Sequence, residues 1–147
     1  MVNTTYLSLI GRVFLGLLFL TSGIHKIADP QGTQQYMTAM GMTWMTTVFY
    51  LGAVTVELAG SLSLLLGYCS RAGACLLFLF LIPTTLIFHI HFGDPNQMIH
   101  FLKNLSIMGG LLYVANYGAG SLSMDAGVER SAHVPVPPRT LKKVVHQ

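Results

Sequence analysis

Four long apolar segments follow one another along the chain, separated by short polar stretches. They cover residues 6–24, 47–66, 72–89 and 101–117. Each is close to the length of about 20 helical residues that crosses the roughly 30 Å hydrocarbon layer of a bilayer. Arg12 is the only charged residue in the first segment and Glu57 the only one in the second, whereas the fourth contains Lys103. The pattern predicts an all-α integral membrane protein, built as a four-helix bundle.

The polarity of the chain changes after the fourth segment. Residues 119–147 are mostly polar and basic, and they include Pro135, Pro137 and Pro138. Such a composition is typical of extended, exposed chain. We therefore expect a four-helix transmembrane domain over residues 1–118 and an extended polar and basic tail over residues 119–147.

The overall composition supports a membrane protein. Of the 147 residues 52% are hydrophobic and only 9% are charged, whereas about a quarter of the residues of a soluble domain are charged. The apolar content excludes intrinsic disorder. Two cysteines, Cys69 and Cys75, are too few for a disulfide framework and lack the C-x-x-C spacing of thiol oxidoreductases.

The distribution of basic residues predicts the orientation of the helices. Four spans place both termini on one side, and that side collects most of the Lys and Arg residues outside the spans: Arg71, Arg130, Arg139, Lys142 and Lys143. The opposite side holds Lys26 and Lys103. By the positive-inside rule both termini are cytoplasmic. The tail lacks a basic face interleaved with aromatic residues, so no nucleic-acid partner is expected.

Ionisable residues inside membrane spans are costly and are therefore candidates for function. Arg12 and Lys26 share a helical stripe of the first segment with Gly16, Phe19 and Gly23. A comparable stripe of the second segment consists of Tyr50, Ala53, Val54, Glu57, Gly60 and Ser61. Two such faces imply a shared interior in which Arg12 and Glu57 can meet as an ion pair. The pair would either fix the packing of the helices or form part of a ligand site.

A second polar cluster is expected on the outer side of the membrane, where three helix ends meet. It is made up of His25, Lys26, His89, His91, His100, Lys103 and Asn104. Imidazoles are frequent metal ligands, which makes His89, His91 and His100 the candidate metal ligands. No cysteine lies nearby, and Asp94 is the only acidic residue of that loop. We therefore expect no metal centre here.

Arg, Glu, His, Lys and Asn side chains beneath aromatic rings suit a particular kind of ligand. They donate hydrogen bonds to carbonyl oxygens and exchange protons, while apolar walls hold a ring. A quinone head group or a similar small ligand fits this description. No covalently bound cofactor is expected.

Several short motifs together resemble the DoxX/DoxD-like membrane proteins, over about residues 8–125. They are the segment 11–26, Glu57 followed by Gly60, Ser70-Arg71, Phe88-His89, the segment 101–105, and Gly109-Gly110. The resemblance implies a four-helix inner-membrane protein of a bacterium or archaeon. Some members of this family are small subunits of a thiosulfate:quinone oxidoreductase, and others associate with detoxifying enzymes in a membrane oxidoreductase complex.

Nine positions match the recurrent polar and small residues of that family: Arg12, Ser22, Gly23, His25, Lys26, Glu57, His89, Lys103 and Asn104. All except Gly23 are our candidates for ligand or quinone binding, and none is assigned a catalytic role. His91, His100 and the Pro-rich basic tail have no match in the family pattern.

Two functions follow from these observations. The first is a DoxX-like, multi-pass subunit of a redox-linked complex in a bacterial inner membrane, which binds a quinone or similar small ligand in a polar intramembrane pocket. The alternative is a non-catalytic accessory subunit of a larger respiratory or photosynthetic assembly, docked through its tail. In both cases the partners are the lipid bilayer and other subunits. The chain has no haem, flavin or nicotinamide motif, so as an enzyme it would act within a complex rather than alone.

Overall fold

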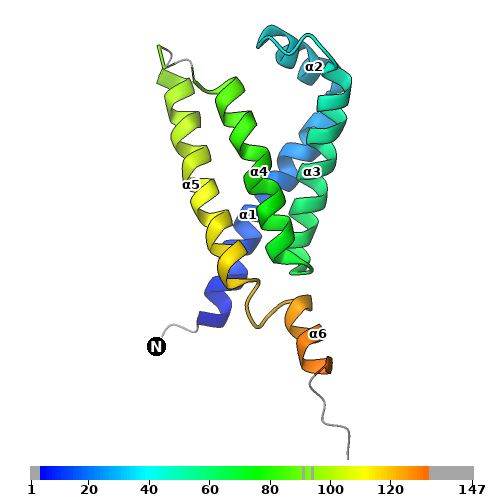
Figure 1. Cartoon of the computed structure of the whole chain (residues 1–147), viewed down its shortest axis with the longest axis vertical. Helices are drawn as coiled ribbons and strands as arrows, with labels where there is room; N and C mark the ends of the chain where they lie inside the picture. The colour runs from blue at the N-terminus through cyan, green and yellow to red at the C-terminus, as the bar shows by residue number, and fades with distance from the viewer. Residues whose placement is uncertain (1–3, 91, 94, 133–147) are drawn as a thin grey trace, which may run out of the picture.

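The computed structural model describes residues 4–90, 92–93 and 95–132. In this part of the chain every regular element is helical, and Figure 1 shows their arrangement: α1 (Thr4–Ala28), α2 (Pro30–Ala39), α3 (Thr46–Leu66), α4 (Ser70–Phe88), α5 (Pro95–Tyr117) and α6 (Met124–Ala132). Helices α1, α3, α4 and α5 are long and apolar enough to cross a membrane. The prediction of an all-α bundle with four spans is confirmed.

The fourth span starts earlier than the sequence pattern predicted. Helix α5 begins at Pro95 rather than at Phe101. Proline suits the first helical position because its missing N–H would have no partner there and its φ angle already matches a helix. His100 and Lys103 therefore lie within α5 rather than at its start.

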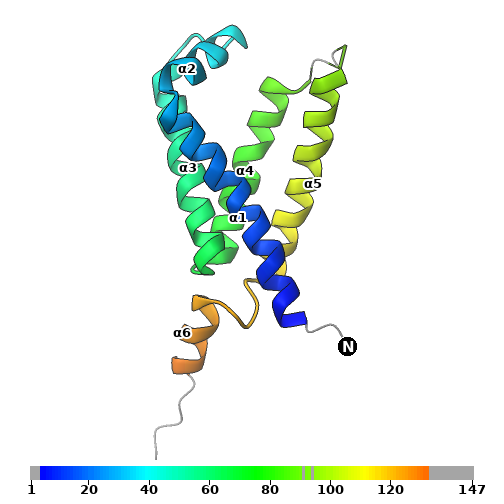
Figure 2. The same cartoon turned by 180° about the vertical axis from the view of Figure 1, so that it is seen from behind.

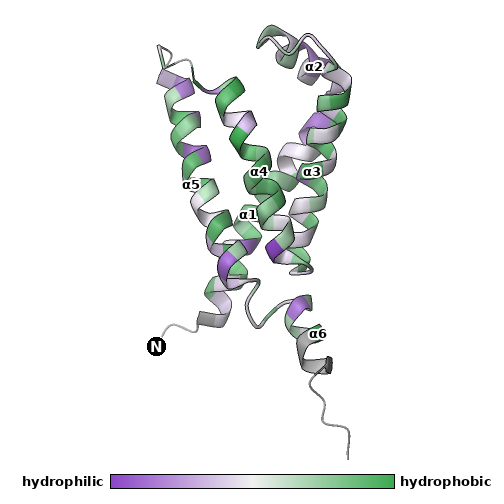
Figure 3. Cartoon of the chain, in the orientation of Figure 1, coloured by the Kyte–Doolittle hydropathy of each residue, from purple (hydrophilic) through white to green (hydrophobic). Residues whose placement is uncertain are grey.

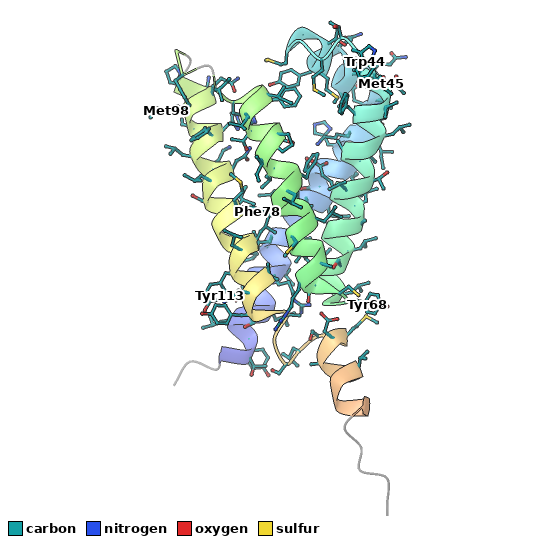
Figure 4. The ribbon with its side chains drawn as sticks, viewed as in Figure 1. Trp44, Met45, Tyr68, Phe78, Met98 and Tyr113 are labelled. Carbon is teal, nitrogen blue, oxygen red and sulfur yellow. The ribbon has the colours of Figure 1, made fainter. Side chains whose placement is uncertain are left out.

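Large apolar side chains cover the outside of the four spans. Phe14, Leu79 and Leu105 are all more than half exposed, and the four long helices are largely hydrophobic along their length (Figure 3). Aromatic side chains mark the two ends of the bundle, with Trp44 at one end and Tyr68 and Tyr113 at the other (Figure 4). Such a surface suits contact with lipid tails, and the aromatic residues at both ends suit the membrane–water interfaces.

Helices α1 and α3 pack closely because two glycines of α1 face α3. A Cβ atom on Gly16 would lie 2.7 Å from Cγ of Leu65, and one on Gly23 would lie 2.9 Å from Cδ2 of Leu58. Small residues allow this approach between membrane helices. The predicted stripe of α1 therefore faces the interior, where Phe19 packs in the core with Leu64, Leu77 and Leu111. The predicted stripe of α3 is buried as well, at Tyr50, Ala53, Glu57, Gly60 and Ser61.

The helices form two pairs that diverge toward one end of the molecule. Helix α1 packs against α3 and helix α4 against α5, and the two pairs separate toward the end that carries α2 (Figures 1 and 2). The short helix α2 turns across this open end. The start of α1 and helix α6 lie at the opposite end.

Residues 124–132 differ from the predicted extended tail, because they form helix α6. The backbone N–H of Asp125 donates to the carbonyl of Gly67 at 2.8 Å. The carboxylate of Asp125 accepts hydrogen bonds from the backbone N–H groups of Cys69 and Ser70. These contacts hold α6 against the loop between α3 and α4. The basic Pro-rich part of the tail, residues 133–147, lies outside the described residues.

Candidate functional site

A cavity of about 640 Å³ lies between α1, α2, α3 and α4. Five of the sequence candidates line it: Ser22, His25, Lys26, Glu57 and His89. Most of the remaining lining is apolar or aromatic, including Met37, Met42, Phe49, Phe80 and Phe88. The cavity is thus an apolar chamber with a small number of polar groups, as is usual for small-molecule sites.

An ion pair between Lys26 and Glu57 forms the polar side of this cavity. Lys26 Nζ lies 2.9 Å from Oε1 and 2.8 Å from Oε2 of Glu57. It also donates to Ser22 Oγ at 2.8 Å, and that hydroxyl donates to Glu57 Oε1 at 3.1 Å. The three side chains form a closed network without net charge, which lowers the cost of holding charges inside a membrane protein.

Helical spacing explains how α1 and α3 position this network. Ser22 and Lys26 are four residues apart and therefore share one face of α1. Glu57 belongs to the buried stripe of α3 and is only 4% exposed. The hydroxyl of Tyr50, on the same stripe, donates to the carbonyl of Lys26 at 3.1 Å.

The expected meeting of Arg12 and Glu57 is wrong. Helices α1 and α3 run in opposite directions, so Arg12, near the start of α1, lies beside Gly67 at the end of α3. Its Nη2 donates to the carbonyl of Leu122 at 2.8 Å. Lys26, fourteen residues further along the same stripe, takes the place that Arg12 was expected to fill.

Arg12 is nevertheless deeply buried, at 2% exposure. Its Nε and Nη1 have no hydrogen-bond partner among the described residues. The nearby charge is that of Asp125 on α6. Arg12 therefore belongs to the end of the bundle where α6 docks, away from the cavity.

Asp125 is stabilised in its charged form by its surroundings. Burial opposes ionisation, but hydrogen bonds from the Ser70 hydroxyl, from the backbone of Ser70 and from the backbone of Cys69 outweigh it, aided by the charge of Arg12. Together they hold the pKa of Asp125 below its usual range. The carboxylate takes the place of an N-cap for α4, whose own cap residue Cys69 makes no side-chain cap bond.

The outer polar cluster is only partly assembled as expected. His89 Nδ1 lies 2.8 Å from Oε1 of Gln97, and the ring of His89 stacks on that of His100 with centroids 5.1 Å apart. Asn104 donates to Oγ1 of the buried Thr85 at 3.0 Å, so it links α5 to α4 rather than lining the cavity. Lys103 is exposed and also lies outside the lining.

The metal candidates do not form a ligand set in the described part of the chain. No group of three His, Cys, Asp or Glu side chains close enough to hold a metal ion occurs there. His100 contributes a ring contact to His89 instead. His91 lies outside the described residues.

Helix α2 contributes lining residues that the sequence analysis missed. Tyr36 and Met37 line the cavity, and the ring of Tyr36 stacks on that of Phe88 of α4 with centroids 5.6 Å apart. The sequence does contain a helix start signal here, an N-cap residue, Asp29, followed by Pro30. In the structure Asp29 accepts a hydrogen bond from the backbone N–H of Gly32 at 2.9 Å. This stack connects α2 to α4 at the end where the α1–α3 pair and the α4–α5 pair separate.

Comparison with known proteins identifies a family and two similar proteins. A family model described as DoxX matches residues 7–90. The inner membrane protein YqjF of Escherichia coli is 36% identical over 117 residues, which are 80% of this chain and 88% of that protein. The E. coli inner membrane protein YphA is 35% identical over 126 residues, covering 81% and 88% respectively. No solved structure matches the chain significantly.

Proposed function

Because the chain belongs to the DoxX family and is a multi-pass protein of the inner membrane, we propose that its cavity binds a lipid-soluble ring compound. We assign a quinone or a similar small ligand to this cavity, and we place the protein as a subunit of a redox-linked membrane complex. The observation that carries the proposal is an apolar chamber that collects five polar candidates from α1, α3 and the C-cap of α4.

The size and chemistry of the cavity support a ring ligand. Its volume of about 640 Å³ lies within the range of roughly 300 to 1,000 Å³ of small-molecule sites. Aromatic and methionine side chains supply flat, adaptable walls, while the Lys26–Glu57 pair adds polarity without net charge. The exposed Asp29 also lines the cavity, and a small amphipathic ring compound suits the mostly apolar walls.

The role within a complex follows from what side chains can do. Electron transfer to or from a quinone needs a redox group, and ordinary side chains do not supply one. The chain has no sequence motif for haem, flavin or nicotinamide. We therefore assign to this protein the binding and orientation of the ligand, and to a partner subunit the transfer of electrons to or from it.

The proposal is tested by filling the cavity. Gly52 lines it, and a Cβ atom at this position would meet nothing within 4 Å. Gly52→Leu should therefore fold normally but lower the affinity for a radiolabelled short-chain ubiquinone in lipid nanodiscs, by about tenfold or more. The matched control is Gly109→Leu on α5, which also has open space around its Cβ position and lies outside the lining. Equal loss in both variants, or no saturable binding to the wild type, would contradict the proposal.

A further inference from the structure

The hydrogen-bond donors of the cavity interior are already used within the protein. Lys26 Nζ has three N–H bonds and three acceptors within 2.9 Å. The Ser22 hydroxyl donates to Glu57, and the hydroxyl of Thr84 donates to the carbonyl of Phe80 at 2.8 Å. A carbonyl-bearing ligand that reaches this part of the cavity therefore meets no unused donor on these side chains.

The contact of His89 with Gln97 fixes which nitrogen of the neutral ring carries the proton. The oxygen of an amide accepts hydrogen bonds and does not donate them, so the contact with Gln97 Oε1 requires the proton of His89 to be on Nδ1. In the neutral imidazole the other nitrogen, Nε2, is then an acceptor. The ring of His100 covers one face of His89 and helps to fix its orientation.

Glu57 has acceptor capacity that the protein leaves unused. Among the described residues, its Oε2 accepts from Lys26 alone, whereas Oε1 accepts from both Lys26 and Ser22. A carboxylate oxygen can accept two hydrogen bonds. His25 and Tyr36 also line the cavity, but both are exposed, so water competes for their donors.

From this imbalance we propose that the cavity selects the hydroxyl-bearing form of its ring ligand, a hydroquinone or phenol, over the carbonyl-bearing quinone. The hydroxyl hydrogen is donated to Nε2 of His89 or to Oε2 of Glu57, and Gln97 acts as a positioning residue that keeps the Nε2 lone pair available. This inference rests on the proposed ring-binding function and specifies the redox form of the ligand that the cavity prefers. A site with this preference takes up the product of a quinone-reducing reaction.

Three probes that share one trimethylated ring measure the preference. They are trimethylhydroquinone, its dimethyl ether, and trimethylbenzoquinone, each titrated under anaerobic conditions onto the full chain in lipid nanodiscs. One net hydrogen bond is worth about 1 kcal/mol, so the hydroquinone should bind about fivefold more tightly than the other two. Equal binding, or preference for the quinone, would overturn this inference and leave ring binding intact. Absence of saturable binding of every probe would overturn the proposed function itself.

Two variants separate the roles of His89 and Gln97. His89→Phe keeps an aromatic ring but removes the acceptor, and it should weaken only hydroquinone binding. Gln97→Leu releases Nδ1, so the proton can move to Nε2 and the ratio between the hydroquinone and quinone affinities should fall toward one. Gln35→Leu is the matched control, because this glutamine is exposed on α2 and does not line the cavity.

The protonated nitrogen of His89 is also directly observable. In ¹⁵N-histidine spectra of the full chain, with the His89→Phe variant providing the assignment, the wild type should show a protonated Nδ1 and an unprotonated Nε2. Gln97→Leu should shift this balance toward protonated Nε2, which a purely structural role of Gln97 would not do. A protonated Nε2 in the wild type would overturn the assignment of His89 as an acceptor.

Discussion

Lys26 and Glu57 form the polar centre of the cavity, and each is the other's principal partner. Their atoms are 2.8 Å apart, with side chains 24% and 6% exposed. Removing one member of such a pair leaves an uncompensated charge, whereas removing both leaves a neutral, packed site. Substitutions of Lys26 and Glu57 are therefore expected to have strongly coupled effects on the free energy of unfolding.

We predict that Lys26→Met and Glu57→Leu each destabilise the protein by about 3 kcal/mol. The double variant should be clearly more stable than the sum of the two single effects implies. Unfolding of all four proteins in the same detergent measures this coupling as a double-mutant cycle. Additive effects would show that the two side chains do not depend on each other.

The sequence predicted which side chains face the interior, but it paired the wrong residues. Periodicity places Arg12 and Lys26 on one stripe of α1, and it cannot tell which of them lies opposite Glu57. That choice depends on the offset between α1 and α3, which is set by contacts such as Gly16 with Leu65 and Gly23 with Leu58. The tautomer of His89 could not be predicted from the sequence either, because it depends on a contact with Gln97 of the next helix, α5.

Two short helices, α2 and α6, complete the ends of the bundle. The four long helices were predictable because each needs about 20 apolar residues. Helix α2 has few apolar residues, and its existence depends on local signals at Asp29 and Pro30. Helix α6 was predicted as extended chain, since its contacts with Gly67, Cys69 and Ser70 are distant in sequence.

The stacking of Tyr36 on Phe88 is expected to hold α2 over the cavity. Tyr36→Ala removes the ring contact and should weaken ligand binding severalfold, because aromatic pairs contribute about 1 kcal/mol beyond their buried area. Tyr36→Phe, which keeps the ring, should bind nearly as well as the wild type. Titration of the same short-chain ubiquinone distinguishes the two variants, and equal affinities would show that the stack is not needed.

Asp125 should make the docking of α6 sensitive to pH. A carboxylate whose pKa is lowered in the docked state contributes its full stabilisation above the ordinary aspartate pKa of about 3.9. The contribution is lost as the pH falls through the lower pKa of the docked state. A spin label at the exposed position Val128 should therefore be restrained at pH 7 and become more mobile at strongly acidic pH.

The matching substitution is Asp125→Asn, which should mobilise the Val128 label already at pH 7. The control is Asp29→Asn, because Asp29 lies on the other end of the molecule at the start of α2. Native Cys69 and Cys75 are replaced by serine in all samples. An unchanged spectrum in Asp125→Asn would show that this carboxylate does not hold α6.

At the scale of the whole molecule, the two ends of the bundle have different roles. One end carries the cavity, which α2 helps to line. The other end carries the start of α1, the α3–α4 loop and α6 (Figure 2). The distribution of Lys and Arg predicts that the second end faces the cytoplasm. The cavity would then lie toward the outer half of the bilayer.

This orientation predicts the labelling of Cys69. Cys69 is exposed in the α3–α4 loop, so a Cys75→Ser variant should react with a membrane-impermeant maleimide in inverted vesicles and remain unlabelled in intact spheroplasts. Thr43→Cys in a variant lacking both native cysteines should behave in the opposite way, because residue 43 lies between α2 and α3. Labelling of Cys69 from outside would reverse the orientation.

The central claim is that the cavity between α1, α2, α3 and α4 holds a ring ligand, and photolabelling in the membrane tests it most directly. A short-chain azidoquinone is activated in nanodiscs, and the modified residues are mapped by mass spectrometry. We predict modification of cavity residues such as Met42 and Phe80, protected by excess unlabelled ubiquinone and reduced in Gly52→Leu. Unprotected labelling spread over lipid-facing residues such as Leu105 would contradict a ligand site in this cavity.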